Sequence, residues 1–404
     1  MHRNPLIVRR KSIKRGDKVE MTGKEAIVFS RPHHSNTLMR TRHIILPILA
    51  CLAACGPSTP SAARARHQQG GLPPERPPLV SGVAGPNDIG LFLAGMPVRR
   101  GAVLSGLQQT AEYQVHRSEM CALWDYCSLR LNPMRTWSDS ELAPVVVGGG
   151  TVLYPFGGPD LLYVNTLFPK ARTYALMGLE KPGDVPALEA MPQGEVLAAL
   201  KTFRQATRYH LANGFFVTED MRSDLQRSAL RGVTPILLST VALAGGRVES
   251  IGSIAAGGKP GVELRFRDAA GKSHRAIYVE GDLSNSGFNG AYRQWLTGLG
   301  GNITYFKAAS YLMHDSQFSQ ARDFFLAQSR VILQDDSGIP FRYFSQDWTL
   351  RFFGNYNQPI NLFSKFRQDD LRQAYRTHPT STLPFGAGYR ISQLEGNLLL
   401  AIKH

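Results

Sequence analysis

The residues best suited to chemistry occupy a short turn that follows a run of β-branched residues. The turn reads YPFGGPD, from Tyr154 to Asp160. Its glycines, Gly157 and Gly158, permit positive φ and let the backbone approach another group closely. A helix beginning after Pro159 would present open N–H groups to an anion, and Asp160 equally suits the start of that helix. The segment therefore predicts either a ligand-binding turn or an ordinary helix start.

The segments around this turn alternate in a β-α-β order. Residues Val145–Tyr154 predict a strand or hairpin, Leu161–Phe168 a helix, and Thr173–Leu179 a strand that ends at Glu180. Twenty residues separate Asp160 from Glu180. This order resembles the opening of a Rossmann-type unit, in which an acid at the end of the second strand faces a ribose.

Two other segments carry groups that could do acid–base chemistry. The sequence LQDDSGIP places Asp335 and Asp336 at a predicted strand end, before a Ser-Gly turn. Adjacent carboxylates there could orient a sugar hydroxyl, bind a metal or act as general acid or base, or they could simply bond the turn backbone. The second segment is His314-Asp315, where a carboxylate could set the imidazole tautomer.

Other catalytic signatures are missing from the sequence. There is no H-E-x-x-H motif, no tight His/Cys cluster and no G-x-S-x-G elbow. We therefore predict no metal site and no cofactor.

The positive charge is concentrated at the N-terminus. The chain has 46 Lys and Arg against 31 Asp and Glu, a formal charge of +15. Residues 1–54 contain eleven basic and three acidic residues, so +8 of the excess lies in that segment. The remaining +7 is spread over 350 residues, so the sequence does not predict binding to nucleic acid.

The N-terminal segment reads as a targeting signal. Arg40 and Arg42 precede an apolar run, Ile44–Ala54, that is too short to span a bilayer and suits a signal peptide. The run ends in LAAC, which resembles the lipobox of bacterial lipoproteins and implies that Cys55 is acylated. Gly56 in the next position, in place of aspartate, favours an outer-membrane anchor facing the periplasm.

These signals divide the chain. With Met39 as the true start, residues 1–38 are a mis-assigned extension and 39–54 the signal peptide. Residues 55–87, rich in Pro, Gly and Ser, form the lipidated cysteine and a tether. Residues 88–404 are predicted to form a single α/β domain with a mixed sheet and the Rossmann-like β-α-β opening.

An N-terminal helical cap is predicted over residues 88–143, where apolar residues recur at helical spacing. Cys121 and Cys127 lie in this cap. In the oxidising envelope they could form a disulfide, or remain two buried thiols. Because positions i and i+6 lie on different helix faces, a bridge would require a break near residues 124–126.

Further elements follow from periodicity and turn residues. Helices are predicted at Leu188–Asn213, from Thr218 onward, and at 319–330 and 364–376, and Thr234–Ala244 could be helix or strand. A hairpin is predicted at 263–267 and 274–280, with strands at 303–308, 331–334, 339–344 and 348–353.

Several motifs together resemble a family of uncharacterised exported bacterial proteins, over roughly residues 88–404. They are YPFGGPD, the segment Gly178–Glu180, KAASYLMH at 307–314, LQDDSGIP at 333–340 and PFG at 384–386. In that family the position of Gly157 more often carries serine. The resemblance implies a domain span and an envelope location, and it implies no reaction.

We expect a cell-envelope lipoprotein that binds a small molecule or glycan where Tyr154, Asp160, Glu180, Asp335 and Asp336 converge at strand ends. One alternative is a carboxylate-dependent envelope hydrolase, and another is a structural or assembly lipoprotein with protein partners. A Rossmann-like methyltransferase-type fold ranks lower, because nucleotide cofactors are scarce outside the cytoplasm. The predicted partners are the membrane, through the anchor, and the ligand, with no nucleic acid.

Overall fold

The computed structural model describes residues 82–146, 149–216, 225 and 228–404. The predicted leader, Cys55 and nearly all of the tether lie outside these residues. Within the described part of the chain, no helix is both long and apolar enough to cross a membrane.

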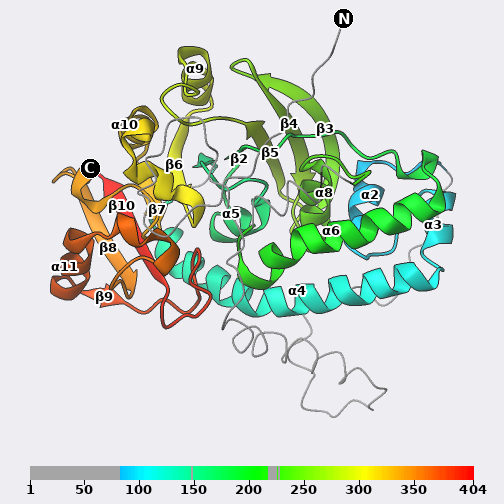
Figure 1. The fold of residues 1–404 in the computed structure, drawn as a ribbon, viewed down its shortest axis with the longest axis horizontal. Helices are drawn as coiled ribbons and strands as arrows, with labels where there is room; N and C mark the ends of the chain where they lie inside the picture. The colour runs from blue at the N-terminus through cyan, green and yellow to red at the C-terminus, as the bar shows by residue number, and fades with distance from the viewer. Residues whose placement is uncertain (1–81, 147–148, 217–224, 226–227) are drawn as a thin grey trace, which may run out of the picture.

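The strands form one mixed sheet in the order β3-β4-β5-β2-β1-β6-β7-β10-β8-β9 (Figure 1). Their bounds are β1 Thr151–Tyr154, β2 Thr173–Gly178, β3 Arg247–Ala256, β4 Lys259–Arg267, β5 Ser273–Glu280, β6 Gly301–Phe306, β7 Val331–Gln334, β8 Trp348–Gly354, β9 Thr380–Ser381 and β10 Asn397–Lys403. The five central strands, β5 to β7, are parallel, and β4 and β10 pair antiparallel with the strands that flank them. The predicted α/β class with a mixed sheet is therefore confirmed.

The parallel strands follow a doubly wound order. Numbered along the chain they lie as 3-2-1-4-5, so the chain moves outward from β1 first through β2 and β5, then through β6 and β7. The predicted β-α-β opening is β1, helix α5 (Leu161–Leu167) and β2, with β1 and β2 paired in parallel. The order reverses between β1 and β6. Ligands of such sheets bind outside the carboxyl ends of the strands at this switch point.

Helices cover both faces of the sheet (Figure 1). The α-helices are α2 Pro86–Leu93, α3 Ala102–Leu107, α4 Ala111–Trp137, α5, α6 Gln193–Asn213, α8 Thr234–Leu243, α9 Gly290–Gly298, α10 Ser319–Gln328 and α11 Asp369–Thr377. A π-turn, Ser138–Leu142, extends α4, and short 3-10 segments occupy Leu188–Ala190, Ala309–His314, Ser316–Phe318, Phe341–Tyr343 and Asn361–Phe366. The segment predicted as a helical cap contains α2, α3 and α4. Helix α4 lies beside α6.

Alternating side chains of the central strands supply two apolar cores. In β1, Val152 and Tyr154 belong to the core shared with α4, α5, α6 and α8, whereas Leu153 belongs to the core shared with α9 and α10. A parallel strand that is covered on both faces reads as a continuous apolar run. Polar groups of these strands therefore reach a ligand only at the strand ends.

Some elements differ from those predicted. Of the described residues in the predicted segment 145–154, which exclude 147–148, only 151–154 form strand. Residues 339–344 form a turn with a 3-10 segment after Pro340. Residues Thr234–Leu243 form α8, a helix buried on every side, which is why its sequence shows no periodicity. The β4–β5 hairpin is confirmed, with the unpredicted β3 beside it. The predicted helix start near Thr218 lies outside the described residues.

The expected disulfide is wrong for this structure. No bridge joins Cys121 to Cys127, because α4 continues unbroken through both and places them on different faces. The Cys127 thiol is buried 3.9 Å from the Tyr163 hydroxyl, while the Cys121 thiol lies 4.0 Å from the Asp125 carboxylate.

Candidate functional site

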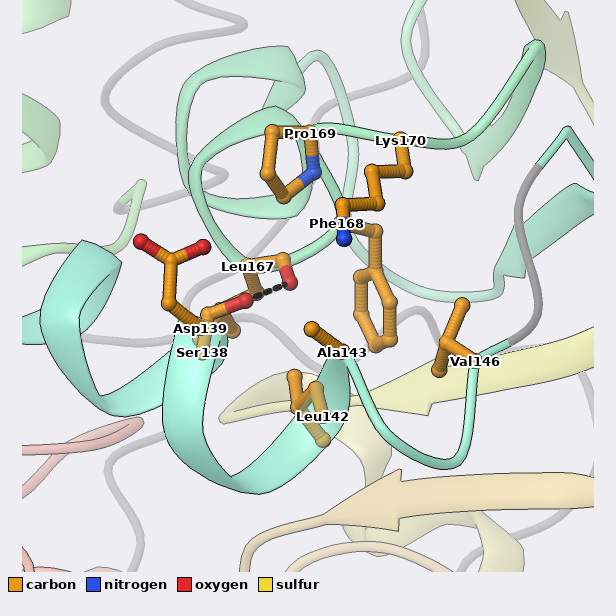
Figure 2. Close-up of a pocket in the computed structure, with 9 residues that line it drawn as sticks. All are labelled: Ser138, Asp139, Leu142, Ala143, Val146, Leu167, Phe168, Pro169 and Lys170. Atoms are coloured by element: carbon orange, nitrogen blue, oxygen red, sulfur yellow. Dashed lines mark hydrogen bonds between the residues drawn. The ribbon is translucent and has the colours of Figure 1, made fainter.

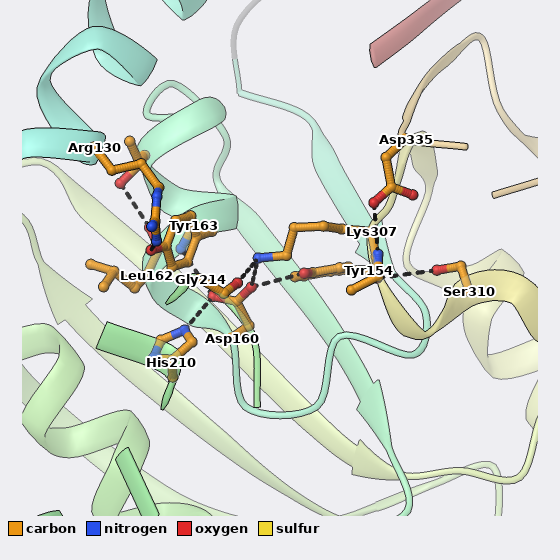
Figure 3. Close-up of polar contacts among 12 residues, drawn as sticks. Arg130, Tyr154, Asp160, Leu162, Tyr163, His210, Gly214, Lys307, Ser310 and Asp335 are labelled. Carbon is orange, nitrogen blue, oxygen red and sulfur yellow. Dashed lines mark hydrogen bonds and ion pairs between the residues drawn. The ribbon is translucent and has the colours of Figure 1, made fainter. Parts of the chain in front are cut away.

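A buried network of polar side chains surrounds Asp160, where β1 ends and α5 begins (Figure 3). One carboxylate oxygen accepts hydrogen bonds from the Tyr154 hydroxyl at 2.8 Å and the Lys307 ammonium at 2.5 Å. The other accepts from the Tyr163 N–H at 3.1 Å and bonds to His210 Nε2 at 2.8 Å. We call these five residues the Asp160 network. It joins residues from β1, α5, α6 and the end of β6.

The ion pair in this network is excluded from solvent. Asp160 is 2% exposed, His210 1% and Lys307 4%. Burial by itself would raise the pKa of Asp160, but Lys307 and His210 outweigh it and hold that pKa well below its usual range. Burial lowers the pKa of His210 and of Lys307, and the attraction of Asp160 opposes this only in part. At neutral pH His210 is therefore an uncharged imidazole that donates Nε2–H to the carboxylate.

Neighbouring helices hold the lysine in place. Its ammonium donates to the Gly214 carbonyl at 2.7 Å and lies 4.0 Å from the centroid of the Tyr163 ring. Arg130 of α4 donates to the Tyr163 hydroxyl and to the Ala212 carbonyl, both at 3.0 Å. Helix α6 ends at residue 213, so the Gly214 carbonyl directly after it reaches the lysine. Helix α5 contributes the Tyr163 ring, and α4 contributes Arg130, which bonds Tyr163.

Asp335 lies at the end of the adjacent strand, β7, and bonds to neutral groups. One of its oxygens accepts from the Ala308 N–H at 2.9 Å. The other accepts from the Ser337 N–H at 2.9 Å and from the Ser337 hydroxyl. Among the described residues, no Lys or Arg forms an ion pair with Asp335. Burial, and then the neighbouring Asp336, raise the pKa of Asp335 to about 6.

Asp336 has different partners from those of Asp335. Its carboxylate accepts from the Tyr311 hydroxyl at 2.5 Å and the Asn397 amide at 2.9 Å, and it pairs with Arg390 at 3.3 Å. The adjacent carboxylates therefore have separate sets of donors.

The backbone between β6 and the following turn links the two acidic centres (Figure 3). Lys307 contacts Asp160, and the next residue, Ala308, contacts Asp335. Ala308 has φ 62° and Phe156, in the turn after β1, has φ 61°. These are the only non-glycine residues with positive φ in the described chain. They lie in the segments that directly follow β1 and β6, the two strands that flank the switch point. Backbone strain of this kind concentrates at functional sites.

The two glycines of the first turn have separate roles. Gly158 adopts φ +56°, which favours glycine. A Cβ on Gly157 would lie 2.6 Å from the Tyr154 ring, so glycine lets this ring fold over the turn. The serine implied at this position by the family resemblance would not fit unless Tyr154 moved. Asp160 bonds the Tyr163 N–H, so the chain's own carboxylate caps α5 where an anion could have bound.

Glu180 and His314 stand apart from the Asp160 network. The Glu180 carboxylate accepts from the Tyr278 hydroxyl at 3.0 Å and lies against the turn at Gly158. Burial, followed by Arg342, lowers the pKa of His314 to about 4. Its Nε2 is buried without a hydrogen-bond partner among the described residues. Asp315 bonds the Gln317 N–H, so it does not orient the imidazole as predicted.

A recess opens beside the Lys307 ammonium. It encloses about 240 Å³, including space open to solvent, between α4, the end of α6 and the loop at 385–388. Its walls include Arg130, Met134, Asn213 and Gly388. We call it the Arg130 recess. It lies at the switch point, where a ligand of a doubly wound sheet is expected.

A second pocket of about 250 Å³ lies at the opposite, amino-terminal end of the parallel strands (Figure 2). Leu142, Ala143, Val146 and Phe168 make it largely apolar, and Ser138 is bonded internally to the Leu167 carbonyl. No cluster of buried charges adjoins it, so we assign the functional site to the other end.

The structure therefore brings together Tyr154, Asp160 and Asp335, with Asp336 beside them. It adds residues that sequence reasoning missed: Lys307, His210, Arg130, Ser337, Tyr311 and Arg390. Lys307 had a signal, because a charged residue directly follows an apolar strand. His210 and Arg130 had none, because only the packing of α4 against α6 turns them inward.

No group of three or more His, Cys, Asp or Glu in the described residues is placed to hold a metal ion. No protein-family model, curated protein or solved structure matches the chain.

Proposed function

We propose that the protein binds a small molecule or glycan in the Arg130 recess, at the carboxyl ends of β1 and β6. The observation that carries this proposal is the buried Asp160–Lys307 pair at the switch point. A buried ion pair contributes little to stability, because desolvation offsets the attraction of the charges. A strongly perturbed pair beside a recess is instead typical of a binding or catalytic site.

The Asp160 network would act as a rigid floor for the ligand. Lys307 is fixed by Asp160, the Gly214 carbonyl and the Tyr163 ring. The ligand would then contact the outer groups, Asn213 and Arg130. Donors held in place before binding lose little entropy when the ligand arrives.

A ligand screen with recess-filling variants tests this proposal. The detergent-solubilised full chain is screened by thermal shift against sugars, muropeptides, nucleotides and divalent metals. A ligand at 100 times its dissociation constant stabilises by about 2.7 kcal/mol. Ala387→Leu should abolish the shift, because Ala387 lines the recess. Ala143→Leu fills the opposite pocket and is the matched control. Equal shifts in both variants would contradict the proposal by placing the ligand outside the recess. No shift with any ligand would contradict it too and would favour a partner-binding lipoprotein.

Hydrolysis of envelope glycans is a second candidate, favoured by the opposite pKa shifts of two acids at one sheet edge. The pKa of Asp160 is lowered, whereas that of Asp335 is raised to about 6. Glycosidases need one ionised carboxylate and one protonated carboxyl. The test is release of reducing ends from peptidoglycan, which Asp335→Asn should reduce at least about 100-fold.

Nucleotide-dependent transfer has less support, although β10 lies antiparallel between β7 and β8, as in methyltransferase-type sheets. Glu180, at the ribose position of such folds, already bonds Tyr278, and Asp160 caps α5. Nucleotides in the same thermal-shift screen test this alternative directly.

We also propose that the protein is a lipoprotein of the bacterial cell envelope, acylated at Cys55 and anchored in the outer membrane facing the periplasm. The support is the charged segment, apolar run and LAAC sequence before Cys55. Metabolic labelling with an alkyne fatty acid should mark the full chain. Cys55→Ser should abolish the label and Cys51→Ser should retain it, and the reverse result would move the lipid to Cys51.

A further inference from the structure

We propose that the Arg130 recess is an anion subsite, and that the ligand carries a carboxylate or phosphate group bound by the Arg130 guanidinium. This proposal rests on the proposed function and names the class of molecule bound there. In this proposal the anion lies beside α4. It does not bind at the start of α5, because the Asp160 side chain already caps that helix.

The charges that line the recess have one sign. Of the eleven lining residues, Arg130 and Lys307 are cationic and none is acidic. Asn213 adds an amide, and residues 386–388 add backbone peptide groups. The pocket at the opposite end has one acid, Asp139, and one base, Lys170. Of these two pockets in the described residues, the Arg130 recess has the lining that favours a negatively charged ligand.

The two cations differ in how far they are neutralised. Lys307 pairs with Asp160, so their charges cancel. Arg130 bonds only neutral groups, the Tyr163 hydroxyl and the Ala212 carbonyl. In the part of the chain that the structure describes, no carboxylate lies within ion-pair distance of Arg130. A guanidinium has several N–H donors in a planar fork, so two such bonds fix its orientation and leave donors for a ligand.

Asp335 is the acid that opposes this attraction most directly. It lies against Gly388, a lining residue, so closely that a Cβ there would overlap it. Its two oxygens already accept three hydrogen bonds, from Ala308 and Ser337. Its oxygens are therefore held by those donors, while Arg130 is itself one of the residues that line the recess. A bidentate guanidinium–anion contact is about twice as strong as a neutral hydrogen bond, which favours binding of the anion.

Matched pairs of probes test the charge of the ligand. The full chain is titrated calorimetrically with glucose and glucuronate, N-acetylglucosamine and N-acetylmuramate, glycerol and glycerol 3-phosphate, and adenosine and AMP. In at least one pair the acidic member should bind about 10-fold or more tightly than its neutral partner. Arg130→Gln should remove that preference, with a loss of about 10- to 100-fold in affinity for the acid.

Two variants separate the charge from a structural role. Arg117→Gln changes an exposed arginine on the same helix and should retain the preference. Arg130→Lys keeps a positive charge at the same position, so it should retain more of the preference than Arg130→Gln does. If Arg130→Lys and Arg130→Gln lose the preference equally while Arg117→Gln also loses it, the effect is structural and the anion subsite is wrong.

The outcomes distinguish this inference from the proposed function. Equal binding of acidic and neutral members, abolished by Ala387→Leu, would leave the binding function standing and overturn the anion subsite. No binding by any probe would overturn both. An acid preference that survives Arg130→Gln would also overturn the assignment to Arg130.

Discussion

Asp160 and Asp335 lie at the same edge of one sheet, yet their surroundings shift the pKa values of the two carboxyl groups in opposite directions. Both are almost fully buried, at 2% and 4% exposure. Asp160 faces a lysine and keeps its charge, whereas Asp335 faces backbone and hydroxyl donors and has its pKa raised to about 6. Burial is therefore not what separates them. A cation in direct contact lowers the pKa of Asp160, whereas Asp335, which has no such contact and a neighbouring carboxylate, has its pKa raised.

Removing the cation should have the largest effect. Lys307→Met leaves the Asp160 carboxylate buried without its partner and should lower the free energy of unfolding by about 3–5 kcal/mol. Urea denaturation at neutral pH measures this. The double variant Asp160→Asn/Lys307→Met, which buries no charge, should recover most of the loss. A single-variant loss below about 1 kcal/mol would show that the pair is not buried as described.

Crowding the second acid should have a smaller effect. A Cβ on Gly388 would lie within 1.8 Å of an Asp335 oxygen, and Gly388 has φ +57°. Gly388→Ala should therefore destabilise by about 2–4 kcal/mol through overlap and backbone strain. Gly106→Ala, in α3 with open space around the added methyl group, should instead stabilise by about 0.5–1 kcal/mol. Similar effects of both substitutions on urea midpoints would argue against the contact with Asp335.

The two acids should give pH dependences of opposite sign. Because the pKa of Asp335 rises from 3.8 to about 6 on folding, its contribution is fully present below pH 3.8 and is lost as pH rises toward 6. Its slope is at most about 1.4 kcal/mol per pH unit. Asp160 has a lowered pKa, so its contribution is present above 3.8 and is lost as pH falls.

Urea titrations of the wild type and Asp335→Asn between pH 4 and 8 isolate this effect. The stability of the wild type relative to the variant should fall between about pH 4 and 6 and then level off. A difference that rises with pH would mean that Asp335 has an unrecognised cationic partner.

The smallest effect should come from one donor to Asp335. Ser337→Ala removes the hydroxyl bond to its carboxylate and should destabilise by about 1 kcal/mol. Because that bond favours the charged form, its loss should also raise the pKa of Asp335 further. Carbon-detected NMR of the carboxyl group reads this pKa, and a downward shift would contradict the assigned role of Ser337.

Much of the sheet could be predicted because its signals are local. The β-α-β opening and the β4–β5 hairpin follow from short apolar runs with turn residues between them. By contrast, β10 and β3 were not predicted. Strand β10 pairs with β7 and β8, which are distant along the chain, and no local pattern records such pairing. Strand β3 pairs with β4 through the two-residue turn Gly257-Gly258, a local hairpin signal that the sequence analysis did not use.

The residues of the candidate site also fall into those that the sequence predicted and those that it did not. Asp160 and Asp335 were predicted because each follows a strand in a polar turn. Glu180 was also predicted, but it bonds Tyr278, since the β2 end faces β5. His210 lies in the last turn of the long amphipathic helix α6, where its sequence position resembles that of any helical residue.

The sequence by itself determined which residues stand at strand ends, because apolar runs and turn residues are local properties of the chain. It also carries the apolar run and the LAAC sequence before Cys55, from which a targeting signal is predicted. Only the tertiary structure decided which acid meets a cation. Asp160 meets Lys307 across 147 residues because β1 and β6 are neighbours in the sheet. That contact lowers the pKa of Asp160, since electrostatic attraction depends on distance in space and not on separation along the chain.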